Sequence, residues 1–568
     1  MKTETRNCQN CKTDFVIEPE DFKFYEKIKV PPPTFCPQCR FQRRLMFFNQ
    51  RSLYKRKCDL CGRDIISTHS SDKPFTVYCP PCWWSDKWNG DEYASEYDSS
   101  RPFLEQVKDL AKKTPHLALN VDYATNINCD YLNHAGHCKN CYLIYIADFC
   151  ENVLYSEMLG YNKDSMDCTM LGGSELCYGD ISCGQCYNTF FSEDCRYCRD
   201  VYFSKSCVGC SNCFGCINLR KKDYHIFNKP YSKEEYEKKI ESFRLHTYSA
   251  IQDLKREVYG FWTEHPQEFM RTNGTRNVNV SGDYVFESKN AKNVWRVWGV
   301  EDSKYCQIVT LKPVRDTYDY TSWGNNVTQV YESTVVGEGA SLVKFSVDCW
   351  PSVSDVEYSM WVISSQHMFG CVNMKKQQYC ILNKQYSPSD FEALKLKIIE
   401  DMKAKPFIDS RGIKYSYGEF FPPELSYFAY NETTAMDYFS ITESQAKEKG
   451  YAWHKGEPSQ YKVTLTSVQL PDSIRDAQDS ILGEVLECSN CKKAFKLVKP
   501  ELDLLRRFDL PIPRECPNCR YEERLGRVNP PRLWDRKCEK CGKDIQTSYA
   551  PERPEIVYCE ECYQKEVI

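Results

Sequence analysis

The sequence predicts a mainly β protein: a duplicated right-handed parallel β-helix-like solenoid with short helices, flanked at both ends by double zinc-ribbon modules. Eight cysteines near the start return near the end, each displaced by 480 positions. Between the two sets, short stretches rich in Asn, Cys, Tyr, Ser and Gly recur regularly, which is typical of a solenoid of short strands. The repeated cysteines are Cys8, Cys11, Cys36, Cys39, Cys58, Cys61, Cys79 and Cys82, matched by Cys488, Cys491, Cys516, Cys519, Cys538, Cys541, Cys559 and Cys562.

These sixteen cysteines form C-x2-C pairs, the spacing at which two thiolates hold one side of a tetrahedral ion. Taken in order, two pairs make a closed four-sulfur site, so about four structural zinc ions are expected. Gly62 and Gly542 follow the second cysteine of a pair, where a tight knuckle often needs a positive φ. Two alternatives stay open: a cross-braced pairing as in LIM or RING domains, and disulfides, which would require a secreted chain.

The stretch from Cys8 to Arg40, CQNCKTDFVIEPEDFKFYEKIKVPPPTFCPQCR, resembles a family of zinc-binding ribbons with a C-x2-C and C-P-x-C-R pattern. The stretch from Cys488 to Arg520 is similar, although Leu504 and Leu505 replace the Phe-Tyr pair. The chain also looks like multi-ribbon proteins predicted from uncultivated bacterial lineages. This resemblance implies metal binding and no defined activity.

The connector between the first two expected sites is basic and aromatic. It runs from Arg40 to Lys57 as RFQRRLMFFNQRSLYKRK and contains no acidic residue. Basic charge interleaved with aromatic rings suits phosphate contact and base stacking. The alternative is a solvated connector whose rings pack on the ribbons, and the C-terminal copy dilutes the charge with acids. The candidate nucleic-acid contacts are Arg40, Arg43, Arg44, Arg51, Lys55, Arg56 and Lys57.

The predicted solenoid begins near residue 120. Cys183, Cys195 and Cys207 are spaced by twelve residues, and two such units per coil would give a turn of ~24 residues. Residues 200–232 return as residues 355–387 at an offset of 155. Each copy then enters a helix, with Ser232 at a capping-box spacing from Glu235 and Pro388 at a first helical position. We expect this helix to cover the last coil.

Two cysteine clusters in the solenoid also suggest metal. Cys207, Cys210, Cys213 and Cys216 approach a ferredoxin motif but have the wrong final spacing. The duplicate places Val362, Ser365, Met368 and Cys371 there, which favours an inward-facing cysteine ladder. His134, His137, Cys138 and Cys141 form a second cluster, and its duplicate has Glu287, Asn290, Ala291 and Val294. Packing is the favoured interpretation of both clusters.

The expected organisation is two end modules, two solenoid segments with helices, a connector and an aromatic-rich wrap. The favoured function is a non-enzymatic, cytoplasmic scaffold for a macromolecular partner, with RNA or DNA as first candidate and no membrane association. The alternatives are a β-helical carbohydrate-active enzyme, for which Asp148, Glu151 and Asp180 are the nearest acids, and an iron–sulfur or redox protein. The expected boundaries are 1–88, 89–119, 120–260, 274–404, 405–483 and 484–568.

Overall fold

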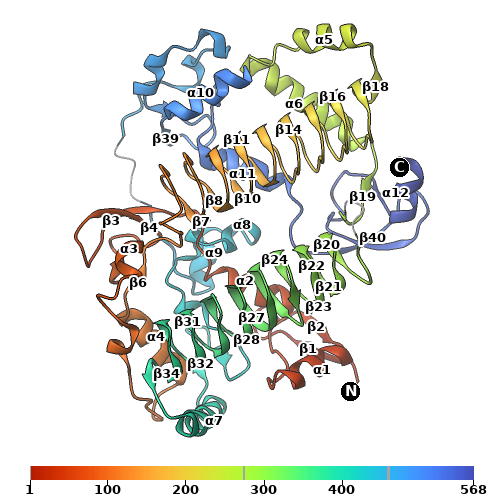
Figure 1. Ribbon diagram of the computed structural model, residues 1–568. Coiled ribbons are helices and arrows are strands. Elements are labelled where there is room, and N and C mark those ends of the chain that lie inside the picture. Colours follow the sequence, from red (N-terminus) through yellow and green to blue (C-terminus); the bar gives the residue numbers. More distant parts are fainter. Residues whose placement is uncertain (1, 273–275, 457–460, 568) are drawn as a thin grey trace.

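Two ladders of parallel strands lie side by side in the computed structural model (Figure 1), which describes residues 2–272, 276–456 and 461–567. The first ladder, orange to yellow in Figure 1, holds two sheets. One consists of β7 (Asn133–Gly136), β8 (Tyr145–Asp148), β10 (Glu157–Gly160) and β12 (Thr169–Gly172). The other consists of β9 (Glu151–Leu154), β11 (Lys163–Met166), β13 (Glu175–Tyr178), β14 (Tyr187–Phe190), β15 (Arg199–Tyr202), β16 (Ser211–Phe214), β17 (Asp223–Ile226) and β18 (Lys229–Pro230).

The register of the first ladder is twelve residues. Tyr145 pairs with Glu157, and Glu157 pairs with Thr169. On the other sheet, Lys163 pairs with Glu175 and Glu175 with Tyr187. The expected turn of ~24 residues is therefore wrong. The twelve-residue spacing of the cysteines is itself the repeat, because each twelve-residue unit contributes to both sheets.

A three-residue unit divides each twelve-residue repeat. Along the last part of the first ladder, every third residue faces inward and is fully buried: Ser204, Cys207, Cys210, Cys213 and Cys216. The residue before each has a positive φ: Phe203, Ser206, Gly209, Asn212 and Gly215. Left-handed backbone at every third position turns the chain, so the next side chain again points inward. The C-x2-C-x2-C-x2-C run therefore occupies four successive inward-facing positions of one twelve-residue repeat.

The second ladder, green in Figure 1, repeats this pattern with units of twelve to fourteen residues. Its strands form one sheet system. They are β20 (Gly282–Phe286), β21 (Lys289–Lys292), β22 (Val294–Trp298), β23 (Val300–Lys304), β24 (Gln307–Leu311), β25 (Val314–Arg315), β26 (Tyr318–Gly324), β27 (Val327–Gly337), β28 (Ser341–Lys344), β29 (Val347–Cys349), β30 (Ser354–Glu357), β31 (Met360–Ile363), β32 (Gln366–Phe369), β33 (Val372–Lys375), β34 (Gln378–Ile381) and β35 (Lys384–Gln385).

Helices follow each ladder as expected. Ser232 and Ser387 both cap a helix, their hydroxyls accepting from the backbone N–H of Glu235 and Asp390. The segment after the first ladder forms two helices. α5 (Lys233–Ser242) ends before Arg244, whose φ of 48° breaks the helix, and α6 (Tyr248–Thr263) begins a second one. After the second ladder, α7 (Pro388–Ala404) is continuous.

The end modules are built alike. Each has two antiparallel hairpins, a pair of helices between them, and a short strand that pairs in parallel with the segment leading into a ladder. In the N-terminal module these are β1 (Glu4–Asn7), β2 (Asp14–Ile17), α1 (Pro19–Lys27), α2 (Pro37–Leu45), β3 (Tyr54–Lys57), β4 (Asp64–Ser67), β5 (Val77–Tyr78) and α3 (Pro80–Trp83). In the C-terminal module they are β38 (Leu486–Glu487), β39 (Ala494–Phe495), α10 (Lys499–Phe508), α11 (Pro517–Arg527), β40 (Trp534–Lys537), β41 (Asp544–Thr547), β42 (Val557–Tyr558) and α12 (Glu560–Val567).

The two modules attach to the ladders in equivalent ways. β5 pairs with β6 (His116–Leu117), which follows α4 (Phe103–Lys113) and leads into the first ladder. β42 pairs with β19 (Gln267–Glu268), which follows α6 and leads into the second. Even the side-chain bonds agree, since His116 contacts the carbonyl of Ala111 and Gln267 donates to that of Trp262. The two halves of the chain are therefore approximately equivalent in structure, like the two subunits of a dimer.

The segment between α7 and the C-terminal module has little regular structure. It contains β36 (Phe407–Ile408), β37 (Lys414–Tyr415), α8 (Ala435–Tyr438), α9 (Glu443–Glu448) and several single 3-10 turns. Several of its aromatic side chains are nevertheless buried, among them Phe420, Phe421 and Tyr430. The expected start of the second segment, residue 274, lies outside the described residues, and the proposed domain boundaries stay a prediction.

Candidate metal centres

Four groups of four cysteines could each hold a metal ion. Group 1 is Cys8, Cys11, Cys36 and Cys39; group 2 is Cys58, Cys61, Cys79 and Cys82; group 3 is Cys488, Cys491, Cys516 and Cys519; group 4 is Cys538, Cys541, Cys559 and Cys562. Within each group all four Sγ atoms lie within 4.8 Å of one another. The grouping follows chain order, so the cross-braced alternative is not adopted.

The local fold explains how group 1 is assembled. β1 and β2 form a hairpin whose turn carries Cys8 and Cys11, and Cys36 is the residue before the first turn of α2, with Pro37 at the first helical position. The backbone N–H of Cys36 donates to Cys8 Sγ at 3.2 Å. Cys79 and Cys516 make the same bond to Cys58 and Cys488 at 3.2 Å. Such bonds stabilise negative charge on the sulfur.

The knuckle turns confirm the prediction made for the glycines. Gly62 and Gly542 both have φ of 74°. In groups 1 and 3 the same place is taken by Lys12 and Lys492, with φ of 61° and 62°. One ligand in every group is exposed, namely Cys11, Cys61, Cys491 and Cys541. Four thiolates fill a tetrahedral shell without leaving a position for water, which is the arrangement of a structural site.

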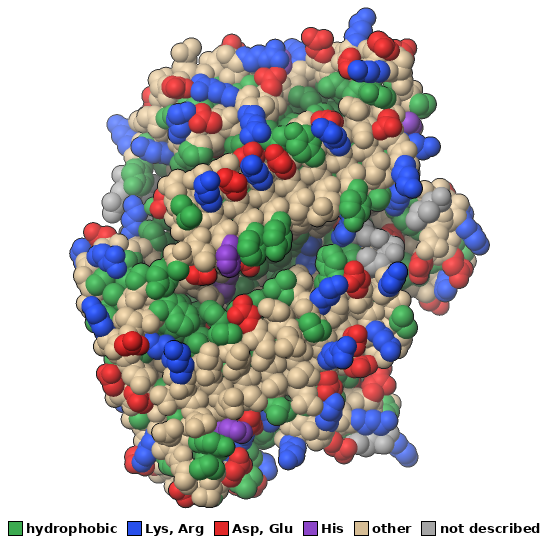
Figure 2. All heavy atoms as spheres, in the orientation of Figure 1, with side chains coloured by type: hydrophobic (Ala, Val, Ile, Leu, Met, Phe, Trp, Pro, Cys, Tyr) green, Lys and Arg blue, Asp and Glu red, His purple; other side chains and the backbone are tan. Residues whose placement is uncertain are grey.

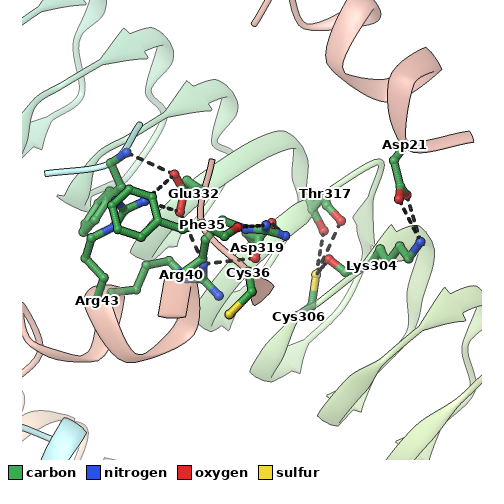
Figure 3. A network of polar contacts seen from close by, with 12 residues as sticks. Asp21, Phe35, Cys36, Arg40, Arg43, Lys304, Cys306, Thr317, Asp319 and Glu332 are labelled. Carbon is green, nitrogen blue, oxygen red and sulfur yellow. Dashed lines mark hydrogen bonds and ion pairs between the residues drawn. The ribbon is translucent and has the colours of Figure 1, made fainter. Parts of the chain in front are cut away.

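Helix α2, which contains Cys39 and directly follows Cys36, also carries arginines that enter the second ladder (Figure 3). Arg40 pairs with Asp319 at 2.9 Å, and Arg44 reaches the other oxygen of Asp319 at 3.2 Å. Arg44 Nε also donates to Thr321 Oγ1 at 3.1 Å. These three charged side chains are at most 1% exposed. Burial by itself lowers the pKa of Arg40, but Asp319 together with Tyr25 and Tyr331 outweighs this and the pKa is raised.

A second ion pair lies beside this one. Arg43 donates to Glu332 at 2.9 Å and to Glu419 at 3.1 Å, and its guanidinium lies 4.0 Å from the ring centroid of Phe35. Glu332 and Glu419 come from the second ladder and from the wrap, so Arg43 joins three parts of the chain. On α1, Asp21 Oδ1 accepts a hydrogen bond from Nζ of Lys304 in the second ladder at 2.9 Å.

The C-terminal module makes the equivalent contacts with the first ladder. Arg520 pairs with Asp167 at 2.9 Å and Arg524 with the same carboxylate at 3.1 Å. Arg524 Nε donates to Thr169 Oγ1 at 3.2 Å. Ribbon residues are displaced by 480 positions and ladder residues by 152, so the two contacts are duplicates. Each module's arginine helix therefore docks on the ladder farther from it in sequence.

Each arginine helix also contacts the segment that follows the other arginine helix. The amide of Gln38 donates to the carbonyl of Pro531 at 3.4 Å, and Arg51 lies 3.5 Å from Asn518 Oδ1. Gln38 and Asn518 are equivalent residues, and so are Arg51 and Pro531. Reciprocal contacts between equivalent residues are the mark of a two-fold interface.

These contacts correct the nucleic-acid prediction for the basic connector. Arg40, Arg43 and Arg44 are buried and paired with carboxylates, so they do not face a phosphate in this structure. Phe47 and Phe48 are also buried and cannot stack on bases.

The remaining basic residues of the connector lie nearer to the surface. Arg51 is held between Tyr145 and Tyr521 and pairs with Glu157 at 3.6 Å. Arg56 pairs with Asp59 at 3.0 Å. Lys55 and Lys57 are exposed, and Lys57 contacts Asp64. Phosphate contact by these residues stays a prediction.

The central cysteines pack inside the first ladder. Cys207, Cys210, Cys213 and Cys216 are fully buried, and so are Val362, Met368 and Cys371 at the duplicate positions. Their thiols donate to backbone carbonyls, as Cys207 does to Lys205 at 3.5 Å. Among the described residues, groups 1 to 4 are the sets of three or more His, Cys, Asp or Glu whose ligand atoms approach one another within 4.8 Å. This agrees with a cysteine ladder.

The His134 set is not brought together either. Cys138 and Cys141 face the interior, like Ala291 and Val294 in the duplicate. His134 instead contacts Asn120 and lies against Phe48, and burial lowers the pKa of His134 to about 4. His137 stacks on Phe149, with ring centroids 4.4 Å apart.

The three acids considered for an enzymatic alternative differ in their burial and in their contacts. Asp180 is fully buried and accepts from Thr189 and from the backbone N–H of Ser192. Glu151 pairs with Lys139 at 3.1 Å on the exposed face. Burial raises the pKa of Asp148 to about 6. No shared catalytic arrangement of these three acids follows from their contacts.

Sequence reasoning missed the carboxylates that receive the arginines: Asp319, Glu332 and Asp167. Arg40 and Arg44 keep the offset to Arg520 and Arg524, but Arg56 and Lys57 also return as Arg536 and Lys537. Retention in both copies therefore does not separate the docking arginines from the surface charges, and the buried Arg43 is replaced by Glu523.

Comparison with known proteins adds little. No family model matches the chain. No curated protein matches it either. One solved structure, a protein from Desulfovibrio desulfuricans G20 named provisionally as an acetyltransferase, matches 51% of this chain and 86% of its own. Its sequence identity is 8% and the TM-score 0.10, which is too low to support any argument. Within the described ranges, no helix is both long and apolar enough to span a bilayer.

Proposed function

We propose that this chain is a zinc-stabilised, non-enzymatic scaffold in which four structural ions fix two modules that clamp two strand ladders. The observation that carries the proposal is the all-cysteine composition of every group, together with the arginine helix that leaves groups 1 and 3. A closed four-sulfur shell offers no position for a substrate. A macromolecular partner, not further specified, would use the ladder surfaces.

The ladders themselves are proposed to be two segments of a right-handed parallel β-solenoid. The support is the constant register of twelve residues in the first ladder and the inward side chain at every third position. An experimental structure that resolved both ladders would test this directly.

The metal proposal is tested by elemental analysis of protein purified without oxygen. We expect about four zinc ions per chain, since sixteen thiolates divide into four closed sites. A Cys36→Ala variant should lose one ion, whereas Cys177→Ala, a buried ladder cysteine outside the four groups, should keep all four. Two or fewer ions in the unmodified chain, or iron in place of zinc, would overturn the proposal.

A further inference from the structure

We infer that groups 1 and 3 are crossed metal-dependent latches: each ion fixes an arginine helix whose release would expose the ladder that is distant in sequence. This rests on the proposed function, because it requires metal in both groups. The feature that carries it is the sharing of one short helix by metal ligands and docking arginines.

The first step is the rigid connection between ligand and arginine. Cys39 lies inside α2 and Arg40 is the next residue, with Arg44 one helical turn further along. In α11, Cys519 is followed by Arg520 and then Arg524. A metal that holds Cys36 and Cys39 therefore fixes the direction in which α2 presents its arginines. Structural zinc sites supply folding free energy to small ribbons of this kind.

The second step concerns the ladder residues that would lose their partners if the arginine helix were released. Asp319 is buried and its cationic partners are Arg40 and Arg44. A buried carboxylate whose cation is withdrawn is strongly unfavourable unless water reaches it. The opened face would also uncover Tyr331, which lies 6.0 Å from Phe24 and 5.5 Å from Tyr25 between ring centroids.

The third step is the duplicate on the other side. Asp167 takes the place of Asp319, and Tyr155 donates to Glu501 at 2.8 Å beneath Arg520. Tyr155 is buried in the first ladder and is covered by the C-terminal module. Groups 2 and 4 are different, because their short strands pair with β6 and β19 instead of sending arginines into a ladder.

The four cysteine ligands within group 1, and those within group 3, differ in their exposure to solvent. Cys11 and Cys491 are the exposed ligands, while the other three cysteines of each group are buried or nearly so. Replacing the exposed ligand by serine removes one thiolate without cutting into the packed core. Cys11→Ser and Cys491→Ser are therefore matched variants that weaken groups 1 and 3.

The experiment is hydroxyl-radical footprinting of the full-length zinc-loaded chain, read at Tyr331 and Tyr155 by mass spectrometry. In Cys11→Ser we expect oxidation of Tyr331 to rise at least about fivefold with Tyr155 unchanged, because opening exposes only the second ladder. In Cys491→Ser the pattern should reverse. Cys61→Ser, in group 2, is the control and should leave both tyrosines protected.

The outcomes separate the latch from the proposed function. If each serine variant loses one zinc but both tyrosines stay protected, or the nearer ladder opens, the latch is wrong while the metal sites stand. If the unmodified chain carries no zinc, the proposed function fails first. Should a variant not fold, chelator titration of the unmodified chain provides the same readout: zinc loss without exposure of either tyrosine refutes the coupling.

Discussion

Asp348→Asn is expected to stabilise the protein, although the same change at the equivalent position of the other ladder should destabilise it. Asp348 precedes Cys349 in the second ladder as Asp194 precedes Cys195 in the first, and both have φ of 53°. Asp194 accepts from Arg271 Nε at 2.9 Å and from the Tyr284 hydroxyl at 3.0 Å. Asn120 stands at the position equivalent to Arg271, so within the described part of the chain no arginine takes that place beside Asp348.

The hydrogen bonds establish that equivalence. The backbone N–H of Arg271 donates to Asp283 Oδ1 at 2.8 Å, and that of Asn120 donates to Asn133 Oδ1 at 2.9 Å. Asp348 is 6% exposed, and its Oδ1 has no hydrogen-bond partner among the residues that the structure describes. Burial alone raises the pKa of Asp348 well above its usual range.

The magnitude follows from proton linkage. The folded protein keeps the Asp348 proton longer than the unfolded chain, so this group's stabilising contribution is complete below its unfolded pKa of about 3.9. The contribution is lost at ~1.4 kcal/mol per pH unit as the pH rises toward the folded pKa. Asparagine removes that loss but leaves an amide partly unsatisfied, which costs about 1–3 kcal/mol. The net gain is this avoided loss less the cost of the amide, and it is expected to grow as the pH rises toward the folded pKa.

Calorimetric melting of the zinc-loaded chain between pH 5.5 and 8 measures this. The melting temperature of Asp348→Asn should exceed that of the unmodified protein by an amount that grows with pH. Burial also raises the pKa of Asp194, but Asp194→Asn leaves Arg271 with less charge compensation and should lower the melting temperature. A loss of stability in both variants at pH 8, or a pH dependence unchanged by Asp348→Asn, would refute the reasoning.

Three further pairs of substitutions test other parts of the structure. Cys207→Val should cost at most ~1.5 kcal/mol in thermal melts, because Val362 fills the duplicate position, whereas Cys519→Val should release one zinc. Arg44→Glu, which places a second acid against Asp319, should cost more than about 3 kcal/mol, while exposed Lys57→Glu should change stability by less than ~0.5 kcal/mol. Gly370→Ala would bring a Cβ within 2.4 Å of Phe103 at a φ of 65°, so a loss of over ~2 kcal/mol is expected; Gly412→Ala, at a φ of 79° with open space around it, should cost only ~1 kcal/mol. Equal losses within any pair would contradict the packing argument behind it.

The repeated cysteines and the duplicated segments could be recognised from the sequence because they depend on local spacing. Groups 1 to 4 follow directly from C-x2-C pairs taken in chain order, and Val362 at the position of Cys207 already favoured packing over a metal cluster. The period predicted for the ladder was too long, because two twelve-residue units were assigned to one turn. The inward position at every third residue, visible in C-x2-C-x2-C-x2-C, gives the shorter period.

The docking of the modules could not be predicted in the same way. Arg40 and Asp319 are far apart in the chain, and no local pattern says which ladder a ribbon will meet. The basic connector was therefore interpreted as a surface for phosphates. A run of arginines has the same sequence pattern whether it binds phosphates or buried carboxylates. Only the tertiary arrangement, in which Glu332 and Glu419 converge on Arg43, distinguishes the two.

The crossed docking sets an order of events during synthesis on the ribosome. Arg44 and Asp319 are 275 residues apart, and Arg524 and Asp167 are 357 apart. At about 5–20 residues per second, the N-terminal ribbon would wait roughly 15–55 s for its ladder to emerge. The first ladder waits longer still, with Asp167 uncovered until almost the last residues are translated. Nascent chains should therefore carry a complete first ladder whose docking face is open to water, and to chaperones, until α11 leaves the exit tunnel.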